Sequence, residues 1–368
     1  MKNVSVIGIG KLGLCFALTL EKAGYRVLGV DVNSKYVDQI NNKTFISVEP
    51  NVNEYLEKSN NFRATTSLEE AINFSDILFV LVATPSLSNG KYNHEALDSV
   101  AKQLMELPKP ISKKQFIIGC TVMPKYTDEL AKKLSFYNYD ISYNPEFIAQ
   151  GSIINDQLKP DMILIGEANK ESGDIIEQIY RDMCINKPCI ERMTPLSAEI
   201  TKIALNCFLT TKISFANMIG DIAVQSGADY EVILRAIGND SRIGAKYLKY
   251  GFGFGGPCFP RDNRALHIFS DEIGYDAKIS KLVDPANQYH LDFQVKRFIE
   301  THKDKSSPIV MDSVTYKPNI DIIEESQQLL FAVNLAKSGF NVVIKETMRV
   351  IEKIKILYSN LFKYEEKI

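Results

Sequence analysis

Short runs of aliphatic residues recur along the first half of the chain, with helix-length segments between them. The runs occupy residues 4–8, 26–30, 77–81, 116–118 and 162–165. They do not alternate with polar residues, which is typical of strands that are buried on both faces. The pattern therefore predicts an α/β fold with a parallel sheet covered by helices on each side.

The pattern changes in the second half of the chain. From residue 197 to about 237 the apolar positions follow the helical period, and we expect helices there without strands. A glycine-rich loop follows over 251–258, and a second, short α/β unit begins at 309–311 after a hinge at 303–307. In that unit we expect one helix, one strand and a solvated amphipathic helical tail, over 325–338, 340–344 and 352–368. The predicted domains are residues 1–196, 197–300 and 301–368.

Composition excludes several classes of protein. The 368 residues include 43 Lys and Arg and 45 Asp and Glu, which gives a net charge of −2. A charge so close to zero does not indicate electrostatic binding to nucleic acid or to a membrane surface. The longest apolar run, 77–83, is too short to span a bilayer, and the first residues lack the pattern of a signal peptide. The six cysteines do not form a secreted disulfide scaffold. We expect a soluble, cytoplasmic protein.

No metal site is expected. The four histidines are far apart, and the spacing of Cys184 and Cys189 is not that of a zinc site. The four histidines and these two cysteines are interpreted as packing or surface residues.

A glycine motif follows the first predicted strand. Gly8, Gly10 and Gly13 form G-x-G-x-x-G between a strand and a helix, where they allow a tight turn, close approach of a pyrophosphate and close helix packing. Asp31 ends the second strand, about 20 residues on, where a carboxylate binds ribose hydroxyls and repels the 2′-phosphate of NADP. Residues 83–85 end a third strand at the same edge of the sheet. A plain strand–helix turn explains the glycines but not Asp31, so a Rossmann-type NAD site is predicted.

Cys258 is the candidate nucleophile. Pro260 favours the first turn of a helix, which puts Cys258 at or just before a helix N-terminus. The helix dipole and Arg261 would favour the thiolate there, and Asp262 could orient or exchange a proton. A single cysteine is more often a buried structural residue. The other candidate residues favour the catalytic interpretation of Cys258 over the structural one.

Three further residues fit an oxidation. Lys202 and Asn206 lie one turn apart in an otherwise apolar helix, where they can stabilise an alkoxide or hold a water molecule. Glu146 follows a short strand and is a candidate base for activating water. Alone, each of the three would be interpreted as a solvated or capping side chain.

Together these motifs resemble the UDP-glucose/GDP-mannose dehydrogenase family of NAD-dependent four-electron oxidoreductases. The resemblance extends over about residues 1–330, through the glycine motif, Asn-Pro-Glu-Phe at 144–147, Arg242, the Cys258 loop and Lys317-Pro318. It implies an N-terminal Rossmann domain, a central helical dimerisation region and a Rossmann-like C-terminal domain, which is short here. A homodimer that binds a nucleotide sugar is therefore expected.

The resemblance also implies roles for the matching residues. Lys202 and Asp262 would assist deprotonation of the sugar C6 hydroxyl, and Cys258 would form a thiohemiacetal and then a thioester. Glu146 would activate the hydrolytic water, which Asn206 and Thr121 would help to hold. The implied cofactor contacts are Gly8, Ile9, Gly10, Lys11, Leu12, Gly13, Asp31, Ala83, Thr84, Pro85, Thr121 and Gln150. The implied substrate contacts are Phe147, Ile148, Ala149, Gln150, Lys202, Asn206, Arg242, Lys249, Tyr250, Phe254, Gly255, Tyr316 and Lys317.

Several alternatives stay open. The run after Asn-Pro-Glu-Phe resembles the UDP-glucose branch, which favours oxidation of UDP-glucose to UDP-glucuronate over oxidation of GDP-mannose or a UDP-hexosamine. A two-electron β-hydroxyacid-type dehydrogenase would not need Cys258. A non-catalytic protein that binds NAD and a nucleotide sugar is suggested by the short C-terminus and by Glu324, where the family has an arginine against the cofactor. Gln150, Arg261 and the Asp312-Ser313 pair are further departures from the family pattern.

Overall fold

The computed structural model describes residues 2–148, 151–318 and 320–367. The chain divides into two compact units, Met1–Lys202 and Ile203–Ile368. The division of the chain into three domains stays a prediction.

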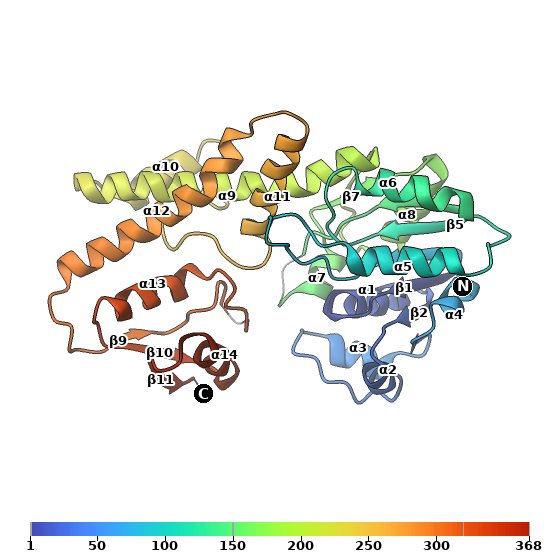
Figure 1. Cartoon of the computed structure of the whole chain (residues 1–368), viewed down its shortest axis with the longest axis horizontal. Helices are drawn as coiled ribbons and strands as arrows, with labels where there is room; N and C mark the ends of the chain where they lie inside the picture. Colours follow the sequence, from blue (N-terminus) through green and yellow to red (C-terminus); the bar gives the residue numbers. More distant parts are fainter. Residues whose placement is uncertain (1, 149–150, 319, 368) are drawn as a thin grey trace. The chain divides into compact units, whose positions relative to one another are not determined.

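An eight-stranded sheet organises the N-terminal unit, with the strand order β3-β2-β1-β4-β5-β6-β7-β8 (Figure 1). The strands are β1 Asn3–Ile7, β2 Arg26–Val30, β3 Phe62–Thr65, β4 Ile77–Val80, β5 Lys114–Ile118, β6 Tyr139–Tyr143, β7 Met162–Gly166 and β8 Cys189–Met193. Neighbouring strands run parallel except β6 and β7, which pair antiparallel through Tyr143 and Gly166. The predicted parallel sheet is confirmed, with this one antiparallel pair as an addition.

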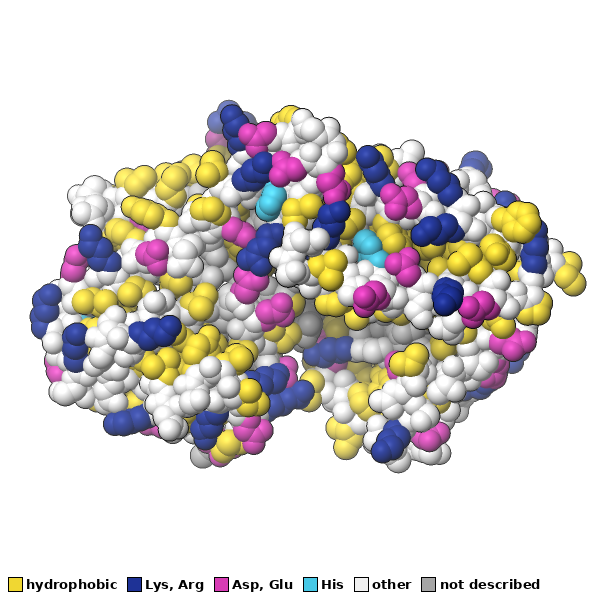
Figure 2. All heavy atoms as spheres, viewed as in Figure 1, with side chains coloured by type: hydrophobic (Ala, Val, Ile, Leu, Met, Phe, Trp, Pro, Cys, Tyr) yellow, Lys and Arg dark blue, Asp and Glu magenta, His cyan; other side chains and the backbone are white. Residues whose placement is uncertain are grey.

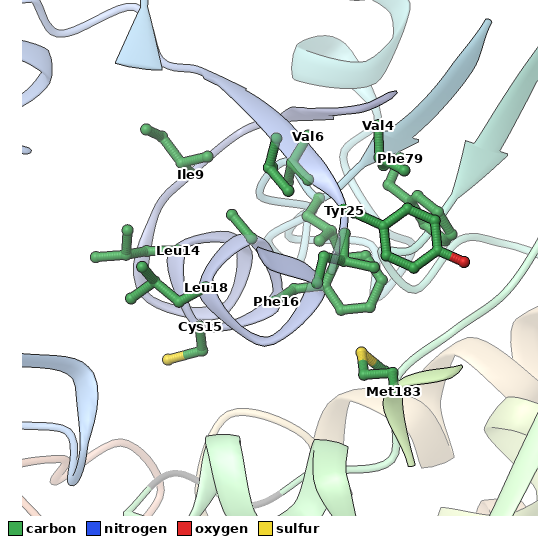
Figure 3. Packing of buried hydrophobic residues seen from close by; sticks show 14 of the residues in the cluster. Val4, Val6, Ile9, Leu14, Cys15, Phe16, Leu18, Tyr25, Phe79 and Met183 are labelled. Carbon is green, nitrogen blue, oxygen red and sulfur yellow. The ribbon is translucent and has the colours of Figure 1, made fainter. Parts of the chain in front are cut away.

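Helices cover both faces of this sheet, because successive strand residues point to opposite sides. Phe79 belongs to one buried cluster, whereas Leu78 and Val80 belong to the other. The Phe79 cluster packs under α1 Lys11–Lys22, α2 Ser34–Asn41, α3 Val52–Lys58, α7 Ile153–Leu158 and α8 Lys170–Met183. The opposite cluster packs under α4 Leu68–Phe74, α5 Glu95–Glu106 and α6 Tyr126–Leu134. Figure 3 shows Phe16 of α1 beside Phe79, with ring centroids 4.8 Å apart in an edge-on contact.

The helix α9, Pro195–Ser226, has 32 residues and belongs to both units. Among the described residues it is the one helix whose length and hydropathy, 1.2 over its most apolar window, would suffice to cross a membrane. However, 39% of that window is buried in the fold, and the core helix of a soluble protein has the same composition. Glu199 and Lys202 are also buried on it and bonded to loops of the fold. We therefore interpret α9 as a core helix.

The rest of the C-terminal unit contains three more helices and a small α/β layer. The helices are α10 Tyr230–Gly238, α11 Phe259–Glu272 and α12 Lys278–Thr301. The strands β9 Ile309–Met311, β10 Val342–Glu346 and β11 Lys363–Glu366 form a parallel sheet in the order β11-β10-β9, accompanied by α13 Gln327–Lys337 and α14 Met348–Tyr358.

The prediction of a helical tail over 352–368 was wrong in its second half. The helix α14 ends at Tyr358, because Ser359 adopts a left-handed backbone with φ of 48°. The next residues form β11, which pairs with β10 through backbone bonds. Its side chains are mostly exposed and charged, so the sequence lacks the alternation of apolar and polar residues that predicts a strand.

We predict that Phe16→Ala lowers the free energy of unfolding by about 3–5 kcal/mol, because the truncation leaves a cavity against Phe79. Urea unfolding measures the change. The matched control is Phe136→Ala, since the Phe136 side chain is 75% exposed and its loss should cost less than about 0.5 kcal/mol. Equal effects of the two substitutions would contradict the packing described above.

Candidate active site

The glycine motif has the geometry of a dinucleotide-binding turn. It joins β1 to α1 where the strand order reverses between β1 and β4, the usual position of a ligand crevice. Gly8 has φ of +89°, and a Cβ atom there would lie 2.7 Å from the Leu81 carbonyl oxygen. A Cβ atom on Gly13 would lie 2.0 Å from the Gly8 carbonyl oxygen. At Gly10, in contrast, nothing lies within 4 Å, which leaves room for a pyrophosphate against the backbone.

The surrounding residues fit NAD. Asp31 follows β2, where a carboxylate can bind ribose hydroxyls, and its Oδ1 accepts a bond from the Asn33 backbone N–H at 3.0 Å. The Tyr36 hydroxyl donates to the Ile9 carbonyl at 2.8 Å and holds the turn. The Ile9 side chain is fully buried in the core, so only the backbone of that residue could face a cofactor. Lys11 lies 3.9 Å from the buried Glu49 carboxylate.

The loop after β5 carries Thr121, and buried groups hold it at three points. The Thr84 hydroxyl donates to the Thr121 carbonyl at 2.8 Å, so two predicted site residues lie together. His94 Nε2 accepts from the Met123 backbone N–H at 3.2 Å. Glu199 of α9 accepts from the N–H groups of Lys125 and Thr127 at 2.6 and 2.8 Å.

Burial changes the protonation of two of these supporting groups. It lowers the pKa of His94 to about 4, in keeping with an unprotonated Nε2 that accepts a bond, and it raises the pKa of Glu199 to about 7. Sequence reasoning missed both roles. A glutamate within an apolar helical run was the available signal for Glu199.

Glu146, Phe147 and Lys202 form a second cluster in the N-terminal unit. Lys202 is 8% exposed, and its Nζ donates to the Glu146 carbonyl at 2.5 Å and lies 4.3 Å from the centroid of the Phe147 ring. The Tyr180 hydroxyl lies 2.7 Å from Asn144 Oδ1 and 3.3 Å from Glu146 Oε1. The structure therefore brings Lys202 into direct contact with the Asn-Pro-Glu-Phe segment, a contact that the sequence analysis did not predict.

The Glu146 carboxyl group is tuned for proton transfer near neutral pH. Burial raises its pKa to about 7, and the Tyr180 hydrogen bond and the Lys202 charge oppose that rise. A base with such a pKa is about half unprotonated at pH 7, so its carboxylate form is available to accept a proton from water. Sequence reasoning missed the contact of Tyr180 with Glu146, because Tyr180 lies in α8, 34 residues further along the chain.

Cys258 and Asp262 form a cluster in the C-terminal unit. Cys258 is the exposed N-cap residue of α11, and proline occupies the first turn as predicted. Asp262 is only 1% exposed, and its Oδ2 accepts from Asn206 Nδ2 of α9 at 2.6 Å. Arg261 Nε lies 3.4 Å from Asp262 Oδ1. The structure thus joins Asn206 to Asp262, although sequence analysis assigned Asn206 to water or oxyanion binding.

Two glycines let the Cys258 loop pack against the segment that precedes α13. A Cβ atom on Gly255 would lie 2.3 Å from the Glu325 carbonyl oxygen, and one on Gly256 would lie 2.7 Å from the Tyr316 ring. The Gly256 N–H donates to the Glu324 carbonyl at 2.9 Å. Glu324, which departs from the family pattern, thus supports the loop with its backbone while its side chain is exposed.

The remaining predicted residues are more dispersed. Arg242 is exposed and forms an ion pair with Asp240, with Nη2 and Oδ2 2.7 Å apart. Lys249 is exposed, Tyr250 and Lys317 are partly buried, and Phe254 is buried. Ala149 and Gln150 lie outside the described residues. Over the described parts of the chain, no group of three or more His, Cys, Asp and Glu residues could hold a metal ion.

The predicted catalytic residues fall into two sets. Thr121, Glu146 and Lys202 belong to the N-terminal unit, whereas Asn206, Cys258 and Asp262 belong to the C-terminal unit. The first set adjoins a dinucleotide-binding turn and offers a base and a cation. The second set offers an exposed thiol at a helix N-terminus with a buried carboxylate in the same helix.

The chain is similar in sequence to known dehydrogenases. The NAD binding domain of the UDP-glucose/GDP-mannose dehydrogenase family matches residues 2–184, and its central domain matches residues 196–289. The UDP-glucose 6-dehydrogenase YwqF of Bacillus subtilis is 31% identical over 346 residues, which are 91% of this chain and 77% of that protein. A GDP-mannose 6-dehydrogenase of Pseudomonas syringae is 29% identical, covering 100% of this chain and 85% of its own length.

A solved structure is also similar. The UDP-glucose dehydrogenase of the hyperthermophilic archaeon Pyrobaculum islandicum has a TM-score of 0.89 at 29% identity, covering 100% of this chain and 86% of that one. Both family domains match in chain order and together span most of the sequence. The chain therefore belongs to the UDP-glucose/GDP-mannose dehydrogenase family and is an NAD-dependent nucleotide-sugar 6-dehydrogenase.

Proposed function

We propose that this enzyme oxidises UDP-glucose to UDP-glucuronate in two successive steps through a thioester on Cys258. The observation that carries the proposal is the exposed Cys258 at the N-terminus of α11, with the buried Asp262 in the next turn. A helix N-terminus favours a thiolate. A dehydrogenase that stops after one oxidation does not need such a nucleophile.

In the first oxidation, the C6 hydroxyl loses a proton and a hydride and becomes an aldehyde. Bound NAD supplies the chemistry of hydride acceptance in each oxidation. The Lys202 ammonium would stabilise the developing alkoxide, since the Glu146 carbonyl and the Phe147 ring hold it in place. Asp262 would take part in moving the hydroxyl proton.

In the second oxidation, the Cys258 thiolate adds to the aldehyde carbon and the resulting oxyanion takes up a proton. This thiohemiacetal then loses a hydride and that proton, which leaves a thioester. Water deprotonated by Glu146 attacks the thioester carbon and releases the uronate and the Cys258 thiolate. The pKa of Glu146 near 7 supports this role, because the carboxylate form is available at neutral pH.

UDP-glucose is the proposed substrate for two reasons. The segment after Asn-Pro-Glu-Phe resembles the UDP-glucose branch, and both YwqF and the Pyrobaculum relative are named as dehydrogenases of UDP-glucose. GDP-mannose and UDP-hexosamines are the competing substrates, since GDP-mannose 6-dehydrogenases are similar at comparable identity.

We also propose that the enzyme is a cytoplasmic homodimer. Cys15, Cys184, Cys189 and Cys207 are free thiols, which suits a reducing compartment. The helix α9 exposes a stripe of apolar side chains at helical spacing, namely Phe208, Phe215, Met218 and Ile222. Figure 2 shows hydrophobic side chains gathered over the region of α9 and α10. An apolar stripe of this kind on a long helix suits self-association.

The first prediction from the proposed function concerns the number of NADH molecules formed per sugar. With UDP-glucose and NAD, we expect about two NADH per sugar consumed and no turnover in Cys258→Ser. The control is Cys189→Ser, because Cys189 is also an exposed thiol but lies in the N-terminal unit, in β8. One NADH per sugar in both wild type and Cys258→Ser would refute the thioester. NADH formation with GDP-mannose or a UDP-hexosamine alone would refute the substrate, and inactivity with all of them would favour the non-catalytic alternative.

The second prediction concerns pH. Below pH 7 the protonated Glu146 cannot take a proton from water, so steady-state turnover should rise roughly tenfold per pH unit and level off above about 7. Glu146→Gln should still form NADH in a first turnover but lose steady-state turnover by about 100-fold or more. Burial also raises the pKa of Glu199 to about 7, so Glu199→Gln is the necessary control. If Glu199→Gln abolishes the acid limb and Glu146→Gln does not, the assignment of the base is wrong.

The third prediction concerns assembly. Size-exclusion chromatography with light scattering should give a dimer mass, and Phe215→Glu in the α9 stripe should weaken the dimer by about tenfold or more. Phe136→Glu is the matched control, because Phe136 is an exposed phenylalanine of the N-terminal unit. A monomer mass for the concentrated wild type would rule the dimer out.

A further inference from the structure

A buried hydrogen-bonded cluster around Gly251 lies outside the residues assigned so far. His290 of α12 and Asp221 of α9 are 3% and 7% exposed. His290 Nδ1 lies 2.8 Å from Asp221 Oδ2 and 3.0 Å from Oδ1, and His290 Nε2 lies 2.6 Å from the Gly251 carbonyl oxygen. Sequence analysis interpreted this histidine as a surface or core residue without a role. The structure gives it two short polar contacts.

Both ring nitrogens of His290 lie within hydrogen-bond distance of oxygen atoms, so the ring connects Asp221 of α9 to the backbone of Gly251. Removing the ring takes one contact away from each of these groups.

Tyr250 also belongs to this cluster. The Tyr250 hydroxyl donates to Asp221 Oδ1 at 2.9 Å, and burial together with that bond holds the pKa of Tyr250 well above its ordinary value. Tyr230 of α10 packs against Tyr250 with ring centroids 4.6 Å apart, and the positive charge of Arg297 of α12 acts on Tyr250. Tyr250 therefore stays a neutral donor to Asp221.

Together with His290, several other side chains form hydrogen bonds to the backbone of residues 250–254. Gly251 N–H donates to Asn217 Oδ1 at 3.1 Å, and Gln294 Nε2 donates to the Gly251 carbonyl at 3.1 Å. Asn287 binds both the N–H and the carbonyl of Phe254, at 3.0 and 2.8 Å. Among these contacts His290 joins the loop to α9 through Asp221.

We propose that His290, hydrogen-bonded to Asp221 and to the Gly251 carbonyl, is a positioning residue for the loop 250–254 and thereby sets the affinity for the nucleotide sugar. The proposal rests on the proposed function and on the substrate contacts that the resemblance implies for Tyr250 and Phe254 of this loop. A loop that is fixed before binding does not have to be ordered by the ligand, so loosening it weakens binding. The chemical steps use other residues and should keep their rates.

The first test needs no substrate. Hydrogen–deuterium exchange of the NAD-loaded protein over 249–256 should be about tenfold faster in His290→Gln and in Asp221→Asn than in wild type. The control is His302→Gln, since His302 is exposed at the end of α12. Unchanged exchange in both variants would overturn the proposal.

The second test separates affinity from rate. His290→Gln should raise the Kd for UDP-glucose, measured by calorimetry on the NADH-loaded enzyme, which cannot oxidise the sugar, by about tenfold while kcat stays within about twofold. His302→Gln should change neither value. Faster loop exchange with an unchanged Kd, or a lower kcat with an unchanged Kd, would overturn the role in affinity. If the wild type binds UDP-glucose without turnover, the proposed oxidation fails, whereas the binding and exchange results still decide the role of His290.

Discussion

The polar side chains that α9 buries bond to other parts of the fold, and these bonds determine where the functional loops are attached. A buried amide or charge without a hydrogen bond is costly, so most of these groups meet a matching atom, although Asn217 Nδ2 and Ser214 Oγ do not. The polar residues recur at intervals that keep them on one side of the helix, namely Glu199, Lys202, Asn206, Thr210, Asn217 and Asp221. Their partners are backbone and side-chain groups of the Thr121 loop, the Glu146 segment, the first turns of α11 and the loop 250–254. One helix thereby supports loops in both units.

This arrangement also sets the protonation states that the chemistry requires. Burial without a full countercharge raises the pKa of Glu146 to about 7, which suits a base that deprotonates water. Asp262 is also buried, but Asn206 donates to it at 2.6 Å and Arg261 lies 3.4 Å away. The two carboxyl groups thus have different surroundings, as expected for one that acts on water and one that assists near the thiol.

Sequence reasoning worked where the signal was local. The aliphatic runs predicted β1, β2, β4, β5 and β7, and Pro260 predicted the helix start that makes Cys258 an N-cap residue. The edge strand β11 escaped notice because its exposed, charged residues give no hydrophobic pattern. The partners of Glu199, Asp221 and Tyr180 could not be predicted, since each lies tens of residues away in the chain and only the folded topology brings it near. Candidate catalytic residues could therefore be proposed from the sequence, but the groups that contact and position them could not.

The central claim is that Cys258 carries the sugar as a thioester between oxidation and hydrolysis. Mass spectrometry of the intact Glu146→Gln protein, mixed with UDP-glucose and NAD and quenched in acid, tests it most directly. If Glu146 activates the water, removal of this base should let the acyl-enzyme accumulate, and peptide mapping should place the added uronyl group on Cys258. Formation of NADH in that variant without any covalent adduct on Cys258 would contradict the account.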